Sequence, residues 1–230
     1  MTSPKPVQTR PSFSEKAKSP PRANGSNSKP APKAHKVFRF RSLKPNQRGN
    51  RLSSVWEIPR VTKDIIVLGD SNLGRVSHVG RDDAHVLSYS GLKLQSLNTL
   101  LQGFKFGSGS LDPGRKPGRV VLSVGINDKT LTPQTNKITL NKVVNEAIRA
   151  FGSTAKICLA QIAYSVSLDL QQRLTITALN KEMEHLASKK QNVSYIPLIS
   201  KSKFRVGKDN IHWTEDCANA TINHFFDHLN

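Results

Sequence analysis

The stretch DIIVLGDSNLGRV, residues 64–76, is apolar over residues 65–68 and turns polar at Gly69-Asp70-Ser71. Its first half predicts a buried strand, because Ile and Val favour strands and the apolar residues run together. A helix-like segment follows at once. The polar residues therefore either form a solvated turn or hold a nucleophile at the carboxyl end of the strand.

After residue 61 the chain alternates short β-rich runs with longer segments of helical spacing. The predicted strands are 64–69, 85–89, 119–124, 156–161 and 193–197, and the predicted helices are 92–104, 138–151, 167–190 and 214–229. Strands that are apolar almost throughout, separated by helices, indicate a parallel sheet covered on both faces. We therefore expect an α/β fold, a three-layer α/β/α sandwich with a five-stranded parallel sheet.

The helix predicted at 167–190 carries apolar residues at steps of three and four, which indicates one buried face. These residues are Leu168, Leu170, Leu174, Ile176, Leu179, Met183 and Leu186.

Four polar groups follow the predicted strands or precede the last helix. They are Ser71, Ser90-Gly91, residues 125–128 (GIND) and residues 209–212 (DNIH). In open α/β sheets ligands bind beyond the carboxyl ends of the strands, so these groups are the candidate site.

The motifs GDSN at 69–72, Gly91, GIND at 125–128 and DNIH at 209–212 resemble the four blocks of the SGNH (GDSL-type) hydrolases, in that family's order. The resemblance covers residues 62–230 and implies a flavodoxin-like SGNH fold and a serine esterase that needs no cofactor.

Elementary chemistry gives three of these residues their roles. A serine hydroxyl is a poor nucleophile unless a base takes its proton, and His212 is the histidine that follows a carboxylate at close spacing in a polar loop. Asp209 is placed to accept a hydrogen bond from the far ring nitrogen, which completes a triad of Ser71, His212 and Asp209.

The resemblance assigns the remaining roles. It implies an oxyanion hole formed by the backbone N–H groups of Ser71 and Gly91 and by the side-chain amide of Asn127. We expect Asp70 to support the loop by accepting hydrogen bonds from backbone amides.

Each residue also has a structural interpretation. Ser71 is suited to cap the next turn, and Asn127 is suited to a turn after its strand. Asp209 is suited to a turn near the start of the last helix, and His212 to a buried position with a satisfied ring. Trp213, where many members of the family have proline or a small residue, is expected to narrow the pocket or to offer a stacking surface.

The chain is strongly basic, with a net charge of +19 over 230 residues and 36% apolar residues. Residues 1–60 hold 14 Lys and Arg against two Glu. Residues 1–36, rich in Pro and Ser, are predicted to be disordered. Residues 37–61 form a basic and aromatic arm that is expected to dock on the domain or to stack on bases. The excess charge makes RNA or DNA the first partner to consider for residues 1–60 and an anionic membrane the second.

The sequence gives little support to a disulfide-bonded, secreted or membrane-spanning protein, or to a metal or nucleotide site. The two cysteines do not suggest a disulfide framework, and no export signal or run of 18 apolar residues is visible. We expect a soluble intracellular protein, cytoplasmic or nuclear. His224 and His228 lie one helical turn apart, but no third ligand with metal-site spacing accompanies them. No metal and no nucleotide cofactor is predicted.

The sequence thus favours an esterase domain that acts on small, acetyl-like acyl groups, because its loops are short and none resembles an apolar lid. The arm makes it resemble the esterase modules of proteins encoded by mobile genetic elements and viruses. One alternative is a non-catalytic nucleic-acid-binding protein on an SGNH-like scaffold. Another is a hydrolase whose arm only targets or solubilises it. In the non-catalytic alternative the affinity rests on the arm and on Arg115, Lys116, Arg119, Lys201, Lys203, Arg205 and Lys208.

Overall fold

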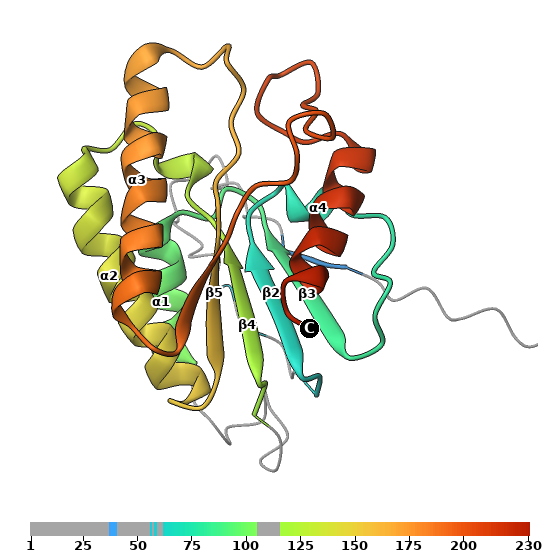
Figure 1. Ribbon diagram of the computed structural model, residues 1–230, viewed down its shortest axis with the longest axis vertical. Coiled ribbons are helices and arrows are strands. Elements are labelled where there is room, and N and C mark those ends of the chain that lie inside the picture. Colours follow the sequence, from blue (N-terminus) through green and yellow to red (C-terminus); the bar gives the residue numbers. More distant parts are fainter. Residues whose placement is uncertain (1–36, 41–55, 57, 59–61, 105–115) are drawn as a thin grey trace, which may run out of the picture. The chain divides into compact units, whose positions relative to one another are not determined.

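The computed structural model describes residues 37–40, 56, 58, 62–104 and 116–230. The disorder predicted for residues 1–36 lies outside these. Within the described residues, six parallel strands form one sheet (Figure 1). The strands are β1 (Phe38–Phe40), β2 (Ile65–Gly69), β3 (Ala84–Tyr89), β4 (Arg119–Ser123), β5 (Lys156–Ala160) and β6 (Val193–Ile196). The helices are α1 (Leu94–Gly103), α2 (Pro133–Phe151), α3 (Leu170–Lys189) and α4 (Glu215–Asp227), with short 3₁₀ turns η1 (Leu73–Arg75) and η2 (Ile126–Asp128).

The strand order is β1-β3-β2-β4-β5-β6. The chain therefore runs outward in one direction from β2 to β3 and in the other from β4 to β6. The point where the order reverses, between β2 and β4, is where α/β folds place their ligands, beyond the carboxyl ends of the strands.

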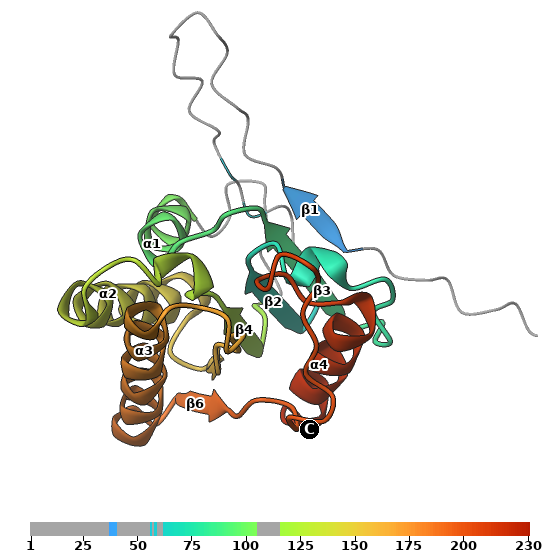
Figure 2. The ribbon, with the colours of Figure 1, turned by 90° about the horizontal axis from the view of Figure 1, so that it is seen from above.

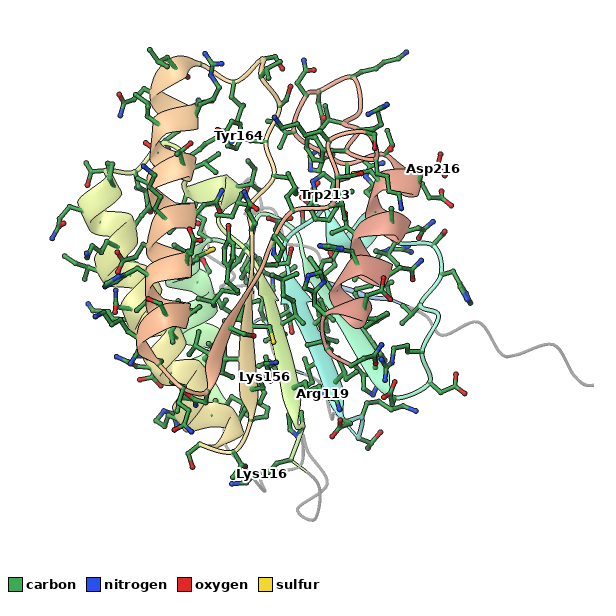
Figure 3. All side chains as sticks on the ribbon, in the orientation of Figure 1. Lys116, Arg119, Lys156, Tyr164, Trp213 and Asp216 are labelled. Atoms are coloured by element: carbon green, nitrogen blue, oxygen red, sulfur yellow. The ribbon has the colours of Figure 1, made fainter. Side chains whose placement is uncertain are left out.

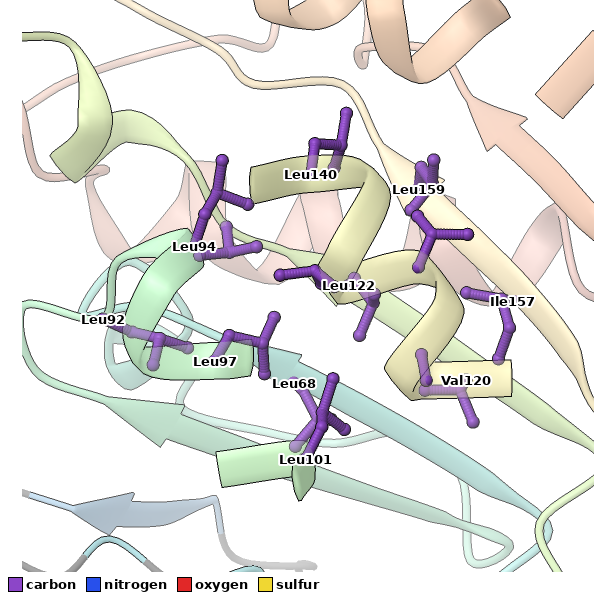
Figure 4. Close-up of a cluster of buried hydrophobic side chains, with 14 of the residues drawn as sticks. Leu68, Leu92, Leu94, Leu97, Leu101, Val120, Leu122, Leu140, Ile157 and Leu159 are labelled. Atoms are coloured by element: carbon purple, nitrogen blue, oxygen red, sulfur yellow. The ribbon is translucent and has the colours of Figure 1, made fainter. Parts of the chain in front are cut away.

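Helices cover both faces of the sheet, as predicted. Helices α1, α2 and α3 lie on one face and α4 lies on the other (Figure 2). Alternate side chains of each strand pack on opposite faces of the sheet. Leu68 packs toward α1, whereas Val67 packs toward α4. Figure 4 shows part of the larger cluster, in which strand and helix leucines interlock. Double-sided burial explains why the strands read as unbroken apolar runs.

The sheet has six strands, not the five predicted. The sixth, β1, comes from the basic arm and adds to the edge of the sheet beside β3. The Phe40 ring stacks on Tyr89 with 4.6 Å between centroids, and Trp56 tilts against the same ring at 5.8 Å. Ile58 is buried. These described residues of the arm pack against the domain.

Three helices start at side-chain caps. The hydroxyls of Thr132 and Thr214 and the carboxylate of Asp169 accept hydrogen bonds from the third residue beyond them. Helix α2 begins at Pro133, five residues before the predicted start, because Thr132 caps it and proline suits the first helical turn.

The predicted apolar face of α3 is only partly buried. Ile176, Leu179 and Met183 lie in the core, but Leu170 and Leu174 are 63% and 53% exposed. The first turns of α3 project past the carboxyl edge of the sheet, so no strand lies beneath them (Figure 1). In the described part of the chain, every helix is too short or too polar to cross a membrane.

Candidate active site

Ser71 lies in the turn that joins β2 to η1. Gly69 makes this turn possible, because a Cβ at that position would lie 2.5 Å from the Ser123 carbonyl oxygen and 2.6 Å from a Leu73 methyl group. The Asp70 carboxylate then accepts a hydrogen bond from the Asn72 amide at 2.9 Å, and the Ser88 hydroxyl donates to the Asp70 carbonyl at 2.8 Å. The loop is therefore held from both sides.

The structure brings together the three residues of the predicted triad. Ser71 Oγ lies 2.9 Å from His212 Nε2, and His212 Nδ1 bonds the Asp209 carboxylate. The other Asp209 oxygen accepts the backbone amides of Ile211 at 3.1 Å and His212 at 3.0 Å. The His212 imidazole and these amides hold the pKa of Asp209 well below its usual range. Asp209 therefore stays ionised beside the imidazole.

The structural interpretations fit some of these residues and not others. Asp209 lies in a turn, where its carboxylate accepts two backbone amides, and Asn127 lies in the 3₁₀ turn η2 that follows β4. The Ser71 hydroxyl faces an imidazole, and η1 has no side-chain cap. Helix α4 is capped by Thr214, not by Asp209. The His212 side chain is 33% exposed, so its ring is open to solvent rather than sealed in the core. Asn210 takes a positive φ of 58°, which turns the chain between Asp209 and His212.

The residues assigned to the oxyanion hole follow the strands on either side of β2. Gly91 follows β3 with φ of 75°, a left-handed conformation that favours glycine, and no atom lies within 4 Å of where its Cβ would be. Asn127 follows β4, and its Nδ2 donates to the Leu92 carbonyl at 3.0 Å. That bond orients the amide and ties it to the Gly91 loop. Ser71 follows β2, the strand that lies between β3 and β4.

Two buried carboxyl groups support these loops. Desolvation raises the pKa values of Asp70 and Asp128 to about 6 each. The Asp128 carboxylate accepts the backbone N–H of Leu94 at 3.0 Å at the start of α1, and the Asp128 backbone carbonyl accepts the side-chain amide of Asn136 at 3.1 Å. Asp128 therefore fixes the segment that follows Gly91, a role that sequence reasoning missed.

Asn72 is a second residue that sequence reasoning missed. Its Oδ1 accepts the Trp213 amide at 2.9 Å, which links the serine loop directly to the histidine loop. The contact joins residues 141 positions apart, and GDSN alone gave no signal for it. Trp213 is 6% exposed, packs in the α4 layer and also lines the cleft beside His212. It therefore stands in the wall of the predicted pocket, with little surface open to a stacking partner. Figure 3 shows Trp213 above the carboxyl end of the sheet.

A cleft of about 490 Å³ opens beside the imidazole. One wall is the loop that carries Asp209 and His212, and the opposite wall is the segment around Arg75 that follows Ser71.

The two histidines that lie one turn apart on α4 bond backbone carbonyls. The His224 ring bonds the Pro197 carbonyl at 2.8 Å and the His228 ring bonds the His224 carbonyl at 2.9 Å. Within the described residues, no group of three or more His, Cys, Asp or Glu is arranged to hold a metal ion.

Comparisons with known proteins identify the fold. Neither a protein-family model nor a curated protein sequence matches the chain. Similar solved structures include the C-terminal catalytic domain of Streptococcus pneumoniae peptidoglycan O-acetyltransferase A, with a TM-score of 0.58 and 15% identity over 74% of this chain and 93% of that one. A lipolytic protein of the G-D-S-L family from Veillonella parvula has a TM-score of 0.55 and 12% identity, covering 72% and 97%. TesA has a TM-score of 0.52 and 18% identity, covering 74% and 98%. The structural neighbours are SGNH hydrolases and acyltransferases, and the predicted SGNH fold is confirmed.

Proposed function

We propose that the protein is a serine esterase that hydrolyses small, acetyl-like esters. The observation that carries the proposal is the chain of contacts from Ser71 Oγ through the His212 ring to the Asp209 carboxylate. A serine becomes nucleophilic when a base at hydrogen-bond distance takes its proton as it attacks. The fold shared with esterases and acyltransferases supports the same reaction class.

In the first half of the reaction Ser71 Oγ attacks the ester carbonyl carbon, and its proton moves to His212 Nε2. The ionised Asp209 stabilises the imidazolium that forms. When the tetrahedral intermediate collapses, the bond between the carbonyl carbon and the alcohol oxygen breaks. The imidazolium then gives its proton to the leaving alcohol, and the acyl group remains on Ser71.

In the second half the neutral imidazole takes a proton from water, which attacks the acyl-enzyme carbonyl and releases the acid. The negative charge that develops on the carbonyl oxygen in both halves needs hydrogen-bond donors. The backbone N–H groups of Ser71 and Gly91 and the Asn127 amide supply them. One N–H of that amide is held by the Leu92 carbonyl, and the other has no partner among the described residues.

The proposal for a small acyl group rests on how open the site is. The side chains of His212 and Asp209 are 33% and 48% exposed, so little protein surface encloses the reacting centre. A long acyl chain gains affinity only where apolar walls bury it.

Turnover of p-nitrophenyl acetate tests the proposal. We expect Ser71→Ala to lower kcat by about 10³-fold or more, because the nucleophile is lost. Ser153→Ala, at an exposed serine before β5, is the matched control and keeps the rate. A fluorophosphonate probe should label Ser71, as read by mass spectrometry of the peptide. An unchanged rate in Ser71→Ala would contradict the proposal of a serine esterase and favour a non-catalytic protein on an SGNH-like scaffold.

We further propose that residues 1–60 contact RNA or DNA and so bring the esterase to it. This role fits the resemblance to mobile-element or viral modules, and it needs an intracellular location. The support is the concentration of 14 Lys and Arg in this segment. Fluorescence anisotropy with a labelled oligonucleotide should show affinity that falls steeply as salt rises. If the affinity does not change with salt concentration, the arm does not contact phosphates. The arm would then serve only to keep the protein soluble.

A further inference from the structure

We infer that the cleft beside His212 binds an anionic group, a phosphate or a carboxylate, carried by the alcohol part of the ester. The inference rests on the proposed function, since it names what the leaving alcohol carries. The cleft has room for such a group, because its volume of about 490 Å³ lies within the range of small-ligand sites, about 300–1,000 Å³.

Unpaired positive charge is the first observation. Arg39, Arg75 and Lys208 line the cleft, and all three side chains are exposed. Among the residues that the structure describes, no carboxylate forms an ion pair with any of them. Cations in a cleft raise the local concentration of anionic ligands, and guanidinium groups match the geometry of phosphate and carboxylate oxygens.

The carboxylates in the cleft offset only part of this charge. Asp209 already accepts hydrogen bonds from the His212 ring and from two backbone amides. Glu215, in the first turn of α4, is the other carboxylate on the walls. The three cations therefore exceed the carboxylates that remain to balance them.

The position of Arg39 is the second observation. Its Nε donates to the Gly74 carbonyl at 2.9 Å and its Nη2 donates to the Val76 carbonyl at 3.2 Å. Neutral carbonyl partners orient the guanidinium without cancelling its charge. Both carbonyls follow the turn that carries Ser71, so strand β1 brings a cation from the basic arm to the wall of the cleft.

The proposal places the leaving alcohol in this cleft, because His212 borders it. His212 Nε2 must hand its proton to the oxygen of the leaving alcohol, so the alcohol passes the imidazole as it departs. His212 forms part of the cleft wall. A group attached to the alcohol therefore enters the space between Arg75 and Lys208, whereas the acyl part faces the oxyanion hole.

Two esters that differ only in a phosphate test the inference: 1-acetylglycerol 3-phosphate and 1-acetylglycerol. We expect the full chain to hydrolyse the phosphate-bearing ester with a kcat/KM about tenfold higher, and the advantage to shrink as salt rises. A third ester, 1-acetylglycero-3-phosphocholine, separates a free phosphorylated alcohol from a lipid headgroup. Equal kcat/KM values for all three overturn the inference but leave the esterase standing.

Variants assign the preference to the cleft. In Arg75→Gln combined with Lys208→Gln, the ratio of the two kcat/KM values should fall to within about twofold of one. Comparing two substrates in one variant cancels any general loss of catalysis. Lys156→Gln, at an exposed lysine near the opposite end of the sheet, is the matched control and keeps the ratio (Figure 3). A ratio unchanged in the double variant assigns the preference to another part of the chain and overturns the inference.

A binding measurement keeps the two proposals separate if none of the esters is hydrolysed. Isothermal titration calorimetry with glycerol 3-phosphate should give a Kd about tenfold weaker in the double variant than in the wild type or in Lys156→Gln. That result sustains an anion site in a protein that is not an esterase. Equal affinity in all three proteins overturns the site.

Discussion

Asn72 joins the two loops that carry Ser71 and His212, the proposed nucleophile and base. It is 3% exposed, and its Oδ1 accepts the Trp213 amide, the residue next to His212. A single buried hydrogen bond therefore sets the backbone of the histidine relative to the serine turn. Asn72 does not touch the reacting atoms in this arrangement, and we regard it as a positioning residue.

Replacing Asn72 should affect kcat more than KM. In Asn72→Ala the Trp213 amide loses its acceptor, so we expect a loss of about 1–3 kcal/mol in the free energy of unfolding. We also expect a fall of about tenfold or more in kcat on p-nitrophenyl acetate, with KM nearly unchanged. Asn72→Asp keeps an acceptor and should recover most of kcat. Asn219→Ala removes a comparable but exposed bond to Ser77 and should keep kcat.

The buried Asp128 carboxyl makes stability depend on pH. Its pKa rises from 3.8 to about 6 on folding, so the folded chain binds more protons between these values. The free energy of unfolding should therefore fall as pH rises from about 4 to about 6. Asp128→Asn removes this titration and keeps an oxygen that can accept the Leu94 amide.

Urea unfolding at pH 4 and pH 7 checks this expectation. The loss of stability between the two should be smaller in Asp128→Asn than in the wild type by about 2–3 kcal/mol. At pH 4, where the carboxyl is largely protonated, the two proteins should be of similar stability. The same loss in both proteins would show that Asp128 does not drive the pH dependence.

At the scale of elements, helix α3 shows where a periodic pattern overstates burial. The apolar spacing is continuous from Leu170 to Leu186, yet the sheet supports only the later turns. Periodicity reports which side of a helix is apolar, but the position of the helix along the sheet decides how much of that side is covered. Periodicity does not report that position.

Substitutions along α3 should therefore differ in cost. Leu179 is 2% exposed, and Leu179→Ala should lower the free energy of unfolding by about 2–5 kcal/mol. Leu174→Ala, at a side chain that is 53% exposed, should cost less than about 1 kcal/mol. Chemical denaturation of the two variants measures both. Similar losses would mean that the first turns of α3 are covered as the pattern predicted.

Strand β1 was missed for a related reason. Three residues, Phe38–Phe40, are too few to show an alternating pattern, and they stand in a segment dominated by Lys, Arg and Pro. What makes them a strand is the partner: β3 offers an open edge, and Phe40 finds the Tyr89 ring there. Pairing between distant segments of this kind has no local signature.

For the whole molecule, composition and periodicity predicted the five longer strands within one residue at their starts and the two-sided cover of helices. They succeeded because a parallel sheet buried on both faces leaves an unbroken apolar run in every strand. The candidate site was predictable as far as its residues follow strands in sequence, as Ser71, Gly91 and Asn127 do. Asn72 and Arg39 were not predictable, because their partners are set by the tertiary fold.

The described residues of the arm, 37–40, 56 and 58, should consequently add to the stability of the domain, and truncation tests this. Removing residues 1–36, which have few apolar residues, should leave the free energy of unfolding within about 0.5 kcal/mol of the full chain. Removing residues 1–61 also removes Phe40, Trp56 and Ile58 from the core and should cost about 3 kcal/mol or more. Urea unfolding of both truncations measures the difference. Equal stability in the two truncations would mean that residues 37–61 contribute no packing to the domain.

The truncations also test the part that Arg39 plays in the cleft. The longer truncation loses Arg39, so its preference for 1-acetylglycerol 3-phosphate over 1-acetylglycerol should fall, whereas the shorter truncation keeps that preference.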